Sequence, residues 1–197
     1  MTSSIPMFIP VPVLEKSLYF QNCLTDATGF LDKIKDKNLL NNWENCNPDS
    51  KDCFDIKLNH ERNNLYKKNI IFENEKDIKK LYLLNSFKMA FSLSIENFCK
   101  IFDLKYNLSN NFILYRQETS SIFDNKLIDV KDYTAILFLN QNLNSTPTVV
   151  YDNENYQNIF PMSGSVLILR PGIQYQIGNF MDSDRFYAVY NFKADII

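Results

Sequence analysis

The stretch SVLILRPGIQYQIGNFMDSDRFYAVYNF spans residues 165–192 and decides the fold. It holds three short runs, SVLILR, IQYQI and RFYAVYNF, which are rich in β-branched and aromatic residues and are separated by Pro, Gly, Asn, Asp and Ser. Such runs between turn-forming residues are typical of short strands. The runs NFILYRQ, YTAILFLN and TPTVVYD, between residues 111 and 152, repeat the pattern. The C-terminal half is therefore predicted to be an antiparallel β domain of sandwich or jelly-roll type.

Helical patterns precede these strands. Residues 25–43 place apolar side chains at mainly helical spacing, and the polar residues 44–53 are predicted to form a loop. Residues 74–104 predict two helices, or one helix broken near Ser92, with Ser92 or Ser94 as the cap of a second segment. We therefore expect a single α+β domain over residues 1–197. Its parts are an extended N-terminal arm (1–24), a mainly helical support (25–104) and the β core (105–197).

The N-terminal arm carries Pro6, Pro10 and Pro12, which exclude a helix and allow an edge strand or a polyproline stretch. Two uses stay open: docking along a neighbouring subunit, and packing on its own domain. The arm has neither a basic leader nor an apolar run long enough to cross a bilayer. We expect a soluble, cytoplasmic protein with no membrane partner.

Charge and cysteine content exclude other classes. The chain has 21 basic and 23 acidic residues and a formal net charge of −2, so we expect no nucleic-acid partner. The cysteines form no C-x-x-C pair and the single histidine is His60, so no structural zinc site is expected. The bias toward Asn, Lys, Ile, Phe and Tyr is typical of an AT-rich coding sequence. It suggests a phage or viral source, in which the domain would be a virion component or act in the host cytoplasm.

Further motifs lie directly before and within the stretch 165–192. Pro161-Met162-Ser163-Gly164 precedes the SVLILR run, and Pro171 follows it. With these motifs, residues 105–193 resemble the double-stranded β-helix (jelly roll) of the 2-oxoglutarate and iron(II)-dependent oxygenases, in particular the prolyl-4-hydroxylase-like branch. In that family His-x-Val would stand where this chain has Tyr175-Gln176-Ile177. Arg185 stands at the family's interval for the arginine that binds the co-substrate.

The resemblance also identifies the positions of the metal ligands. YTAILFLN matches the family's YYLN strand, and counting back from Asn140 by the usual interval reaches Ile122-Phe123-Asp124, where the family has His-x-Asp. The former metal positions are thus Ile122, Asp124 and Tyr175, and both histidines are missing. Gln174 is the alternative to Tyr175 in a register shifted by one residue, and it is not a histidine either.

These replacements weigh against iron chemistry. The family's two histidines and one carboxylate hold Fe(II) on one face. Ile122 offers no donor, and Tyr175 could act only as a phenolate, which is costly for a group with a pKa near 10. We expect no metal, no cofactor and no catalytic residue. Asp124 is a relic ligand or, as we favour, a turn residue. The acidic residues Asp124, Asp129, Asp132 and Asp152 have no calcium-loop spacing.

Arg185 and Tyr115 are the candidate binding residues for a co-substrate or another small carboxylate, since a guanidinium offers a bidentate fork. The alternative, which we favour, is that Arg185 pairs with Asp182, Asp184 or Glu154, or is solvated. The tyrosines Tyr175, Tyr187 and Tyr190 are expected to fill the former active-site cavity and its rim rather than form a stacking platform.

Two functions from different classes follow. The first is a non-catalytic oxygenase-like fold that serves as a binding or assembly module for a protein partner or a second copy, with a small acid as ligand at Arg185. The second is an active 2-oxoglutarate-dependent oxygenase with atypical ligands, which would need Fe(II) and 2-oxoglutarate. A sugar-binding or acid-binding jelly roll of cupin type shares the same fold prediction.

Overall fold

Two antiparallel sheets form the body of the molecule. The computed structural model describes residues 18–22, 44–45, 65–71, 78–117, 127–141, 146–153, 155–160, 162–178 and 183–196. In these residues the large sheet has the strand order β1-β10-β7-β12-β5-β3-β2, with β4 also paired to β12, and the small sheet has the order β6-β11-β8-β9. The strands are β1 (Leu18–Asn22), β2 (Glu44–Asn45), β3 (Leu65–Ile71), β4 (Leu104–Leu108), β5 (Asn111–Gln117), β6 (Ile128–Asp129), β7 (Tyr133–Phe138), β8 (Thr148–Asp152), β9 (Asn155–Ile159), β10 (Ser165–Leu169), β11 (Gln174–Gln176) and β12 (Arg185–Ile196).

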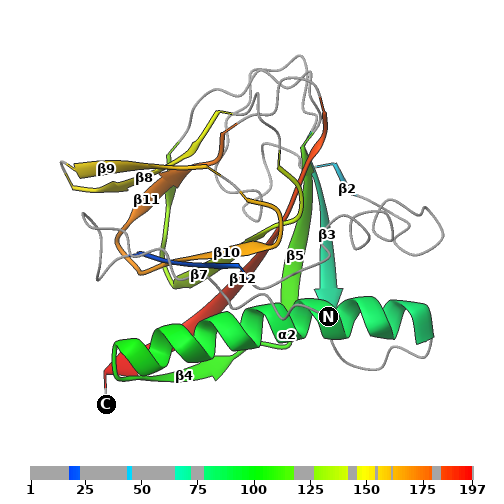
Figure 1. Cartoon of the computed structure of the whole chain (residues 1–197), viewed down its shortest axis with the longest axis horizontal. Coiled ribbons are helices and arrows are strands. Elements are labelled where there is room, and N and C mark those ends of the chain that lie inside the picture. Colours follow the sequence, from blue (N-terminus) through cyan, green and yellow to red (C-terminus); the bar gives the residue numbers. More distant parts are fainter. Residues whose placement is uncertain are drawn as a thin grey trace, which may run out of the picture.

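From β5 onward the chain winds between the two sheets. Strands β5, β7, β10 and β12 belong to the large sheet, and β6, β8, β9 and β11 belong to the small sheet. The two sheets face each other and enclose a barrel, with the helix outside it (Figure 1). This is the double-stranded β-helix, so the predicted α+β jelly roll is confirmed. The six strand runs named in the sequence correspond to β5, β7, β8, β10, β11 and β12.

Strand β12 lies at the centre of the large sheet and is buried on both sides, because its side chains alternate between two cores. Phe186, Ala188 and Tyr190 belong to a core on the helix side, whereas Tyr187 and Val189 belong to the barrel interior. This double burial explains why the run RFYAVYNF is apolar at nearly every position.

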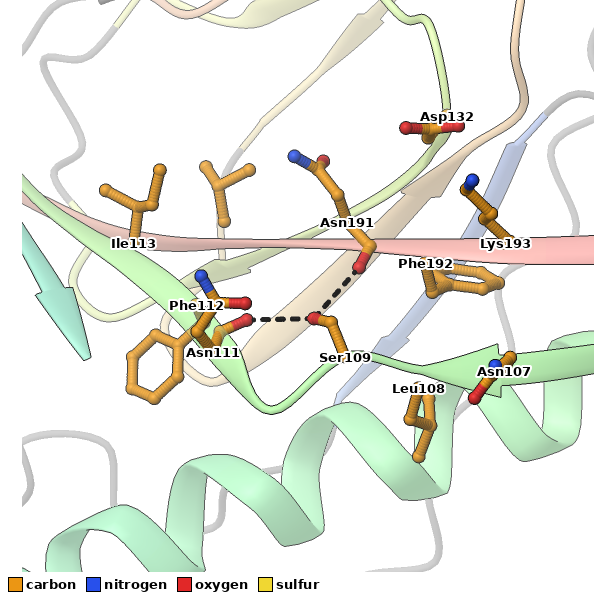
Figure 2. A pocket seen from close by; sticks show the side chains of 11 residues that line it. Asn107, Leu108, Ser109, Asn111, Phe112, Ile113, Asp132, Asn191, Phe192 and Lys193 are labelled. Carbon is orange, nitrogen blue, oxygen red and sulfur yellow. Dashed lines mark hydrogen bonds between the residues drawn. The ribbon is translucent and has the colours of Figure 1, made fainter. Parts of the chain in front are cut away.

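One edge of β12 pairs first with β5 and then with β4. Val189 lies opposite Ile113 and Phe192 lies opposite Leu108, so residues 190–191 of β12 face residues 109–112 and the chain bulges there. A hollow of about 350 Å³ lies beside this bulge (Figure 2). Polar side chains at its rim, such as Asn191 and Ser109, are already engaged in local hydrogen bonds.

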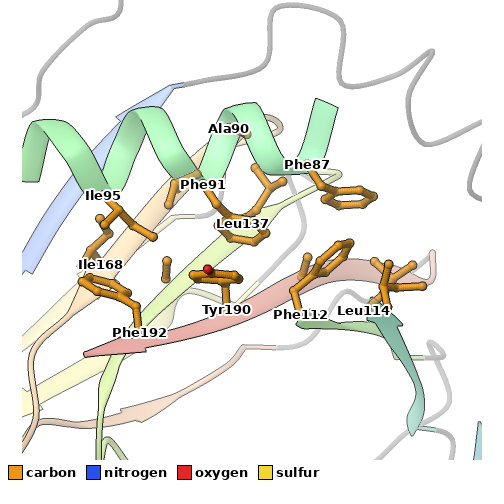
Figure 3. Packing of buried hydrophobic residues seen from close by; sticks show 14 of the residues in the cluster. Phe87, Ala90, Phe91, Ile95, Phe112, Leu114, Leu137, Ile168, Tyr190 and Phe192 are labelled. Carbon is orange, nitrogen blue, oxygen red and sulfur yellow. The ribbon is translucent and has the colours of Figure 1, made fainter. Parts of the chain in front are cut away.

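The helix α2 (Ile78–Ile101) crosses the outer face of the large sheet (Figure 1). Its buried side chains, among them Phe87, Phe91 and Ile95, pack on sheet residues such as Phe112 and Tyr190 (Figure 3). The ring of Phe91 stacks on Tyr190 at a centroid distance of 5.2 Å, and Phe87 lies 4.5 Å from Phe112. This aromatic layer fixes the sheet beneath the helix.

The predicted break of this helix near Ser92 is wrong, because α2 is continuous from Ile78 to Ile101. Ser94 does not cap a second helix. Its hydroxyl donates to the carbonyl oxygen of Ala90 at 3.0 Å, one turn earlier, and so satisfies its polar group inside the helix.

The N-terminal half differs from the prediction in further respects. Strand β2 lies at the start of the predicted loop, and β3 adds a strand to the segment expected to be mainly helical. Of the arm, residues 18–22 form β1, which pairs with β10 of the same chain. The three prolines and the helix predicted over 25–43 lie outside the described residues. No helix in the described part of the chain is long and apolar enough to span a membrane.

Candidate functional site

Arg185 is the first residue of β12, and its side chain enters the barrel interior. Only 1% of its surface is exposed. One guanidinium nitrogen donates to the carbonyl oxygen of Gly178, and Nη2 donates to Thr148 Oγ1 at 3.1 Å. The guanidinium also lies 5.3 Å from the ring centre of Phe138 and 5.9 Å from that of Tyr187. The arginine thus connects β12 to β8 and to the chain that leaves β11.

Burial makes the Arg185 charge costly. Loss of solvent lowers the pKa of the guanidinium from its ordinary 12.5 to about 10, and the neighbouring Tyr187 opposes this shift. A group whose charged form is disfavoured by burial is stabilised by an opposite charge placed beside it. Burial therefore makes the charged form of this guanidinium less stable than it is in water.

The alternative interpretations of Arg185 are corrected in part. The arginine is not solvated. Asp184 is held by Arg116, whose Nε donates to Asp184 Oδ2 at 2.8 Å and whose Nη2 forms an ion pair with the same oxygen at 2.8 Å. Arg116 points to the other side of the sheet, where its guanidinium lies over Tyr66. Asp182 and Glu154 lie outside the described residues.

Tyr175 occupies the middle of β11 and points into the barrel. It is paired with Ile128 on one neighbouring strand and Val150 on the other, and it is 1% exposed. Gln174 is exposed and donates to Asp129 Oδ1 at 2.7 Å. Adjacent residues of a strand point to opposite faces of the sheet. Of the two alternatives in β11, Tyr175 is therefore the residue that points into the barrel, and Gln174 points outward.

The hydroxyl of Tyr175 is buried and has no hydrogen-bond partner among the described residues. Burial raises its pKa well above the ordinary value of 10.0, so the phenol stays protonated at physiological pH. A protonated phenol is a poor metal ligand, because ligation requires the phenolate. In its buried state the Tyr175 phenol is therefore a poor ligand for a metal ion.

The described neighbours of Tyr175 do not form a set of ligands for Fe(II). Its direct neighbours on the small sheet, Ile128 and Val150, offer no donor, and the nearest polar residue in the same row is Gln157 beyond Val150. Within the described ranges, no group of three His, Cys, Asp or Glu side chains could hold a metal ion. Ile122, Asp124 and His60 lie outside those ranges, so their predicted roles stay predictions.

The other acidic candidates are placed elsewhere. Asp152 pairs with Arg170 at 3.0 Å, and Asp129 accepts its bond from Gln174 on the outer face of the small sheet. Asp132 is exposed at the rim of the hollow beside β12. Asp129 and Asp132 are thus exposed outside the barrel, and Asp152 is engaged by Arg170.

Of the four candidate tyrosines, Tyr115, Tyr175 and Tyr187 lie in the barrel and Tyr190 does not. Tyr115 of β5 is fully buried there and stacks on Tyr187 with a centroid distance of 5.0 Å and an interplanar angle of 14°. Tyr115 and Arg185 therefore share Tyr187 as a neighbour. Tyr190 was expected in the same cavity, but it lies on the helix side of the sheet, because it is an odd number of residues away from Tyr187 along β12.

Sequence reasoning missed Thr148, Gly178 and Gln157. Thr148 and Gly178 are the acceptors of Arg185, and they come from segments 37 and 7 residues away in the chain. Gly178 also lies against the backbone of Thr146 and Pro147, so closely that a Cβ atom would overlap their oxygens. The sequence feature that could have revealed this close contact is the glycine just after β11, because a residue without a Cβ atom fits there.

Comparison with known proteins agrees with the topology. No family model matches the sequence, and no characterised protein matches it. In structure the chain is similar to a prolyl-4-hydroxylase of Pseudomonas putida, with a TM-score of 0.60 and 10% identity over 90% of this chain and 92% of that one. It is similar to the non-haem α-ketoglutarate-dependent carbocyclase SnoK of nogalamycin biosynthesis, with a TM-score of 0.62 and 9% identity over 91% and 81%.

A prolyl hydroxylase of Trichoplax adhaerens, solved with a hypoxia inducible factor peptide, gives a TM-score of 0.59 and 13% identity over 90% of this chain and 84% of that chain. At such identities the likeness shows the fold and not the activity. The chain has the double-stranded β-helix fold seen in 2-oxoglutarate-dependent oxygenases.

Proposed function

We propose that this chain is a non-catalytic member of the oxygenase-like fold that binds a small carboxylic acid in its barrel without iron. The observation that carries the proposal is Tyr175. It stands where the resemblance puts a metal histidine, it is fully buried, and burial keeps its phenol protonated. The apolar side chains beside it complete an interior that suits packing or a neutral group better than a cation.

Arg185 is the proposed acid receptor. Its guanidinium is buried inside the barrel and contacts the carbonyl of Gly178, the hydroxyl of Thr148 and aromatic faces. A carboxylate beside it would form charge-assisted hydrogen bonds in a medium of low polarity, where they are strong. Tyr115, which stacks on the same Tyr187, lines the chamber from β5.

The second candidate is an active 2-oxoglutarate-dependent oxygenase with atypical ligands. The observation that favours it is the place of Arg185, inside the barrel at the family's position for the co-substrate arginine. The two candidates differ in their need for metal. The non-catalytic module binds acid alone, and the oxygenase binds acid and Fe(II) together and converts 2-oxoglutarate.

Thermal unfolding of the full chain under anaerobic conditions separates them. The melting temperature is measured with 2-oxoglutarate, with Mn(II) as a redox-inert substitute for Fe(II), and with both. A ligand at about a hundred times its dissociation constant adds roughly 2.7 kcal/mol to the free energy of unfolding. We expect stabilisation by the acid alone, no further effect of Mn(II), and loss of the effect in Arg185→Met.

The matched control is Arg116→Gln, an arginine on the neighbouring strand that lies outside the barrel. It should keep the full acid effect. Stabilisation that requires Mn(II) as well as the acid, or release of succinate from 2-oxoglutarate in the presence of Fe(II), would overturn the proposal in favour of the oxygenase.

The expected protein partner and the virion role remain proposals that rest on composition and on the N-terminal arm. The described part of that arm, β1, is used within the chain, where it extends the large sheet beside β10. Light scattering of the purified chain across a concentration series measures whether a second copy binds. A monomer at every concentration would leave the barrel ligand as the main part of the proposal.

A further inference from the structure

Two buried polar atoms lie in one cross-strand row on the interior face of the small sheet. The row runs Ile128, Tyr175, Val150, Gln157, from β6 through β11 and β8 to β9. The Tyr175 hydroxyl and the Gln157 Oε1 atom are both shielded from solvent, and neither has a hydrogen-bond partner among the described residues. Buried polar atoms are nearly always paired, so two unpaired atoms in one row require an explanation.

The shape of the row suggests what the two atoms could contact. Val150 lies between Tyr175 and Gln157 and has a shorter side chain than either neighbour. The two polar atoms therefore stand on either side of a short, fully buried apolar side chain in the barrel interior. A small polar group placed over Val150 could contact both atoms.

Arg185 connects this row to the acid site. Its bonding partner Thr148 is the interior residue of β8 next to Val150, two positions along the strand. Two positions along a strand correspond to roughly 7 Å. One short-chain acid could therefore reach from the guanidinium to the Tyr175 row.

We infer that the Tyr175 hydroxyl and Gln157 Oε1 form a recognition site for a hydroxyl group on the acid bound at Arg185, so that the chain selects hydroxy acids. The inference rests on the proposed function. A hydroxyl fits because it donates one bond, which Gln157 Oε1 can accept, and accepts another, which the Tyr175 phenol can donate. An ammonium group also donates, but its charge would be costly among Val150, Ile128 and their apolar neighbours.

Three acids that differ in one substituent test this inference. Succinate, malate and aspartate carry hydrogen, hydroxyl and ammonium at the same carbon. Their affinities for the full chain are measured by isothermal titration calorimetry with EDTA present, so that metal cannot contribute. We expect malate to bind about tenfold more tightly than succinate, the effect of roughly one or two hydrogen bonds. Aspartate should bind most weakly.

The variants Tyr175→Phe and Gln157→Leu should each reduce the ratio of malate to succinate affinity toward one while leaving succinate binding in place. Arg116→Gln is the control and should keep the ratio. Circular dichroism confirms that each variant is folded, and Tyr175→Phe, which removes a single oxygen atom, is the variant on which the test depends.

The outcomes separate the inference from the proposed function. Equal binding of succinate and malate by the native chain, or a malate preference that persists in Tyr175→Phe, overturns the inference and leaves the acid-binding proposal intact. Failure of all three acids to bind overturns both. A malate preference that disappears in both barrel variants supports both.

Discussion

The helix side and the barrel side of the large sheet are equally closed to solvent, but they bury different kinds of atoms. On the helix side the buried hydroxyls are satisfied locally, since Ser94 donates to Ala90 and Tyr190 donates to Ser109. The barrel side buries a guanidinium, and its buried polar atoms include the Tyr175 hydroxyl and Gln157 Oε1, which have no hydrogen-bond partner among the described residues. Both sides are thus buried, and they differ in how completely their polar atoms are paired within the described residues.

The helix side should respond to truncation as a pure packing core. Phe91→Ala removes a ring that lies 5.2 Å from Tyr190 and 5.8 Å from Phe112. We expect the free energy of unfolding to fall by about 3–5 kcal/mol. Urea unfolding followed by circular dichroism measures it. Met89→Ala, at an exposed position of the same helix, should change stability by less than about 0.5 kcal/mol. A loss of similar size in both variants would contradict the helix-side core.

The barrel side should be sensitive at its close backbone contact. In Gly178→Ala the new Cβ would overlap the backbone oxygens of Thr146 and Pro147, and the carbonyl that accepts from Arg185 would have to move. We expect a loss of about 1–3 kcal/mol, as for overpacking, together with weaker stabilisation by acids.

The control is Gly172→Ala, which has open space but a φ of +87°. It should lose about 1–2 kcal/mol through backbone strain and keep the acid effect. Melting temperatures with and without 2-oxoglutarate measure both properties. Full acid stabilisation in Gly178→Ala would show that the Gly178 carbonyl does not position Arg185.

The sequence predicted most strands of the barrel, but it did not predict every strand or the continuity of the helix. The strand runs from Asn111 onward were visible because β-branched and aromatic residues cluster between turn residues. Strand β9 was missed, because its sequence NYQNI is polar at an exposed sheet edge. The helix break was predicted wrongly because Ser94 can bond to its own helix. The family resemblance pointed to Arg185 and Tyr175 as site residues, but the favoured interpretation of Arg185 as paired or solvated did not foresee its burial in the barrel.

The polar row could not be predicted, because it depends on the register of three strands. Gln157 meets Tyr175 only through Val150, and nothing in their sequence spacing reveals that alignment. Tyr190 shows the same dependence. The prediction put it with Tyr187 because both lie on one strand, whereas alternation places it on the opposite face.

The unsatisfied phenol should give the barrel side its own pH signature. Tyr175→Phe removes a buried hydroxyl that has no described partner, so without ligand the variant should be more stable by about 1 kcal/mol. The folded state raises the pKa of Tyr175, which means that it holds the proton more tightly than the unfolded chain does. The native chain therefore loses stability from about pH 10 upward, where the unfolded phenol ionises.

The variant has no such group, so its advantage should be constant below about pH 9 and should grow above pH 10. Urea unfolding of both proteins from pH 7 to 11 measures the difference. Other tyrosines titrate in both proteins, and their contributions cancel in the comparison. A difference that does not change with pH would mean that Tyr175 is accessible and ionises normally, and the barrel side would then not be a closed chamber.

The smallest expected effect is at Arg116. This variant tests whether the acid effect depends on the position of Arg185 inside the barrel or on the loss of any positive charge from this part of the sheet. Arg116 and Arg185 lie on neighbouring strands, but the Arg116–Asp184 pair has side-chain exposures of 35% and 29%. Because such partly exposed ion pairs contribute little, Arg116→Gln should cost about 0.5 kcal/mol and should lose that effect in high salt. Its melting temperature should rise with 2-oxoglutarate as much as that of the native chain. Loss of the acid effect in Arg116→Gln would place the acid outside the barrel, and the difference between the two sides of the sheet would then be one of packing alone.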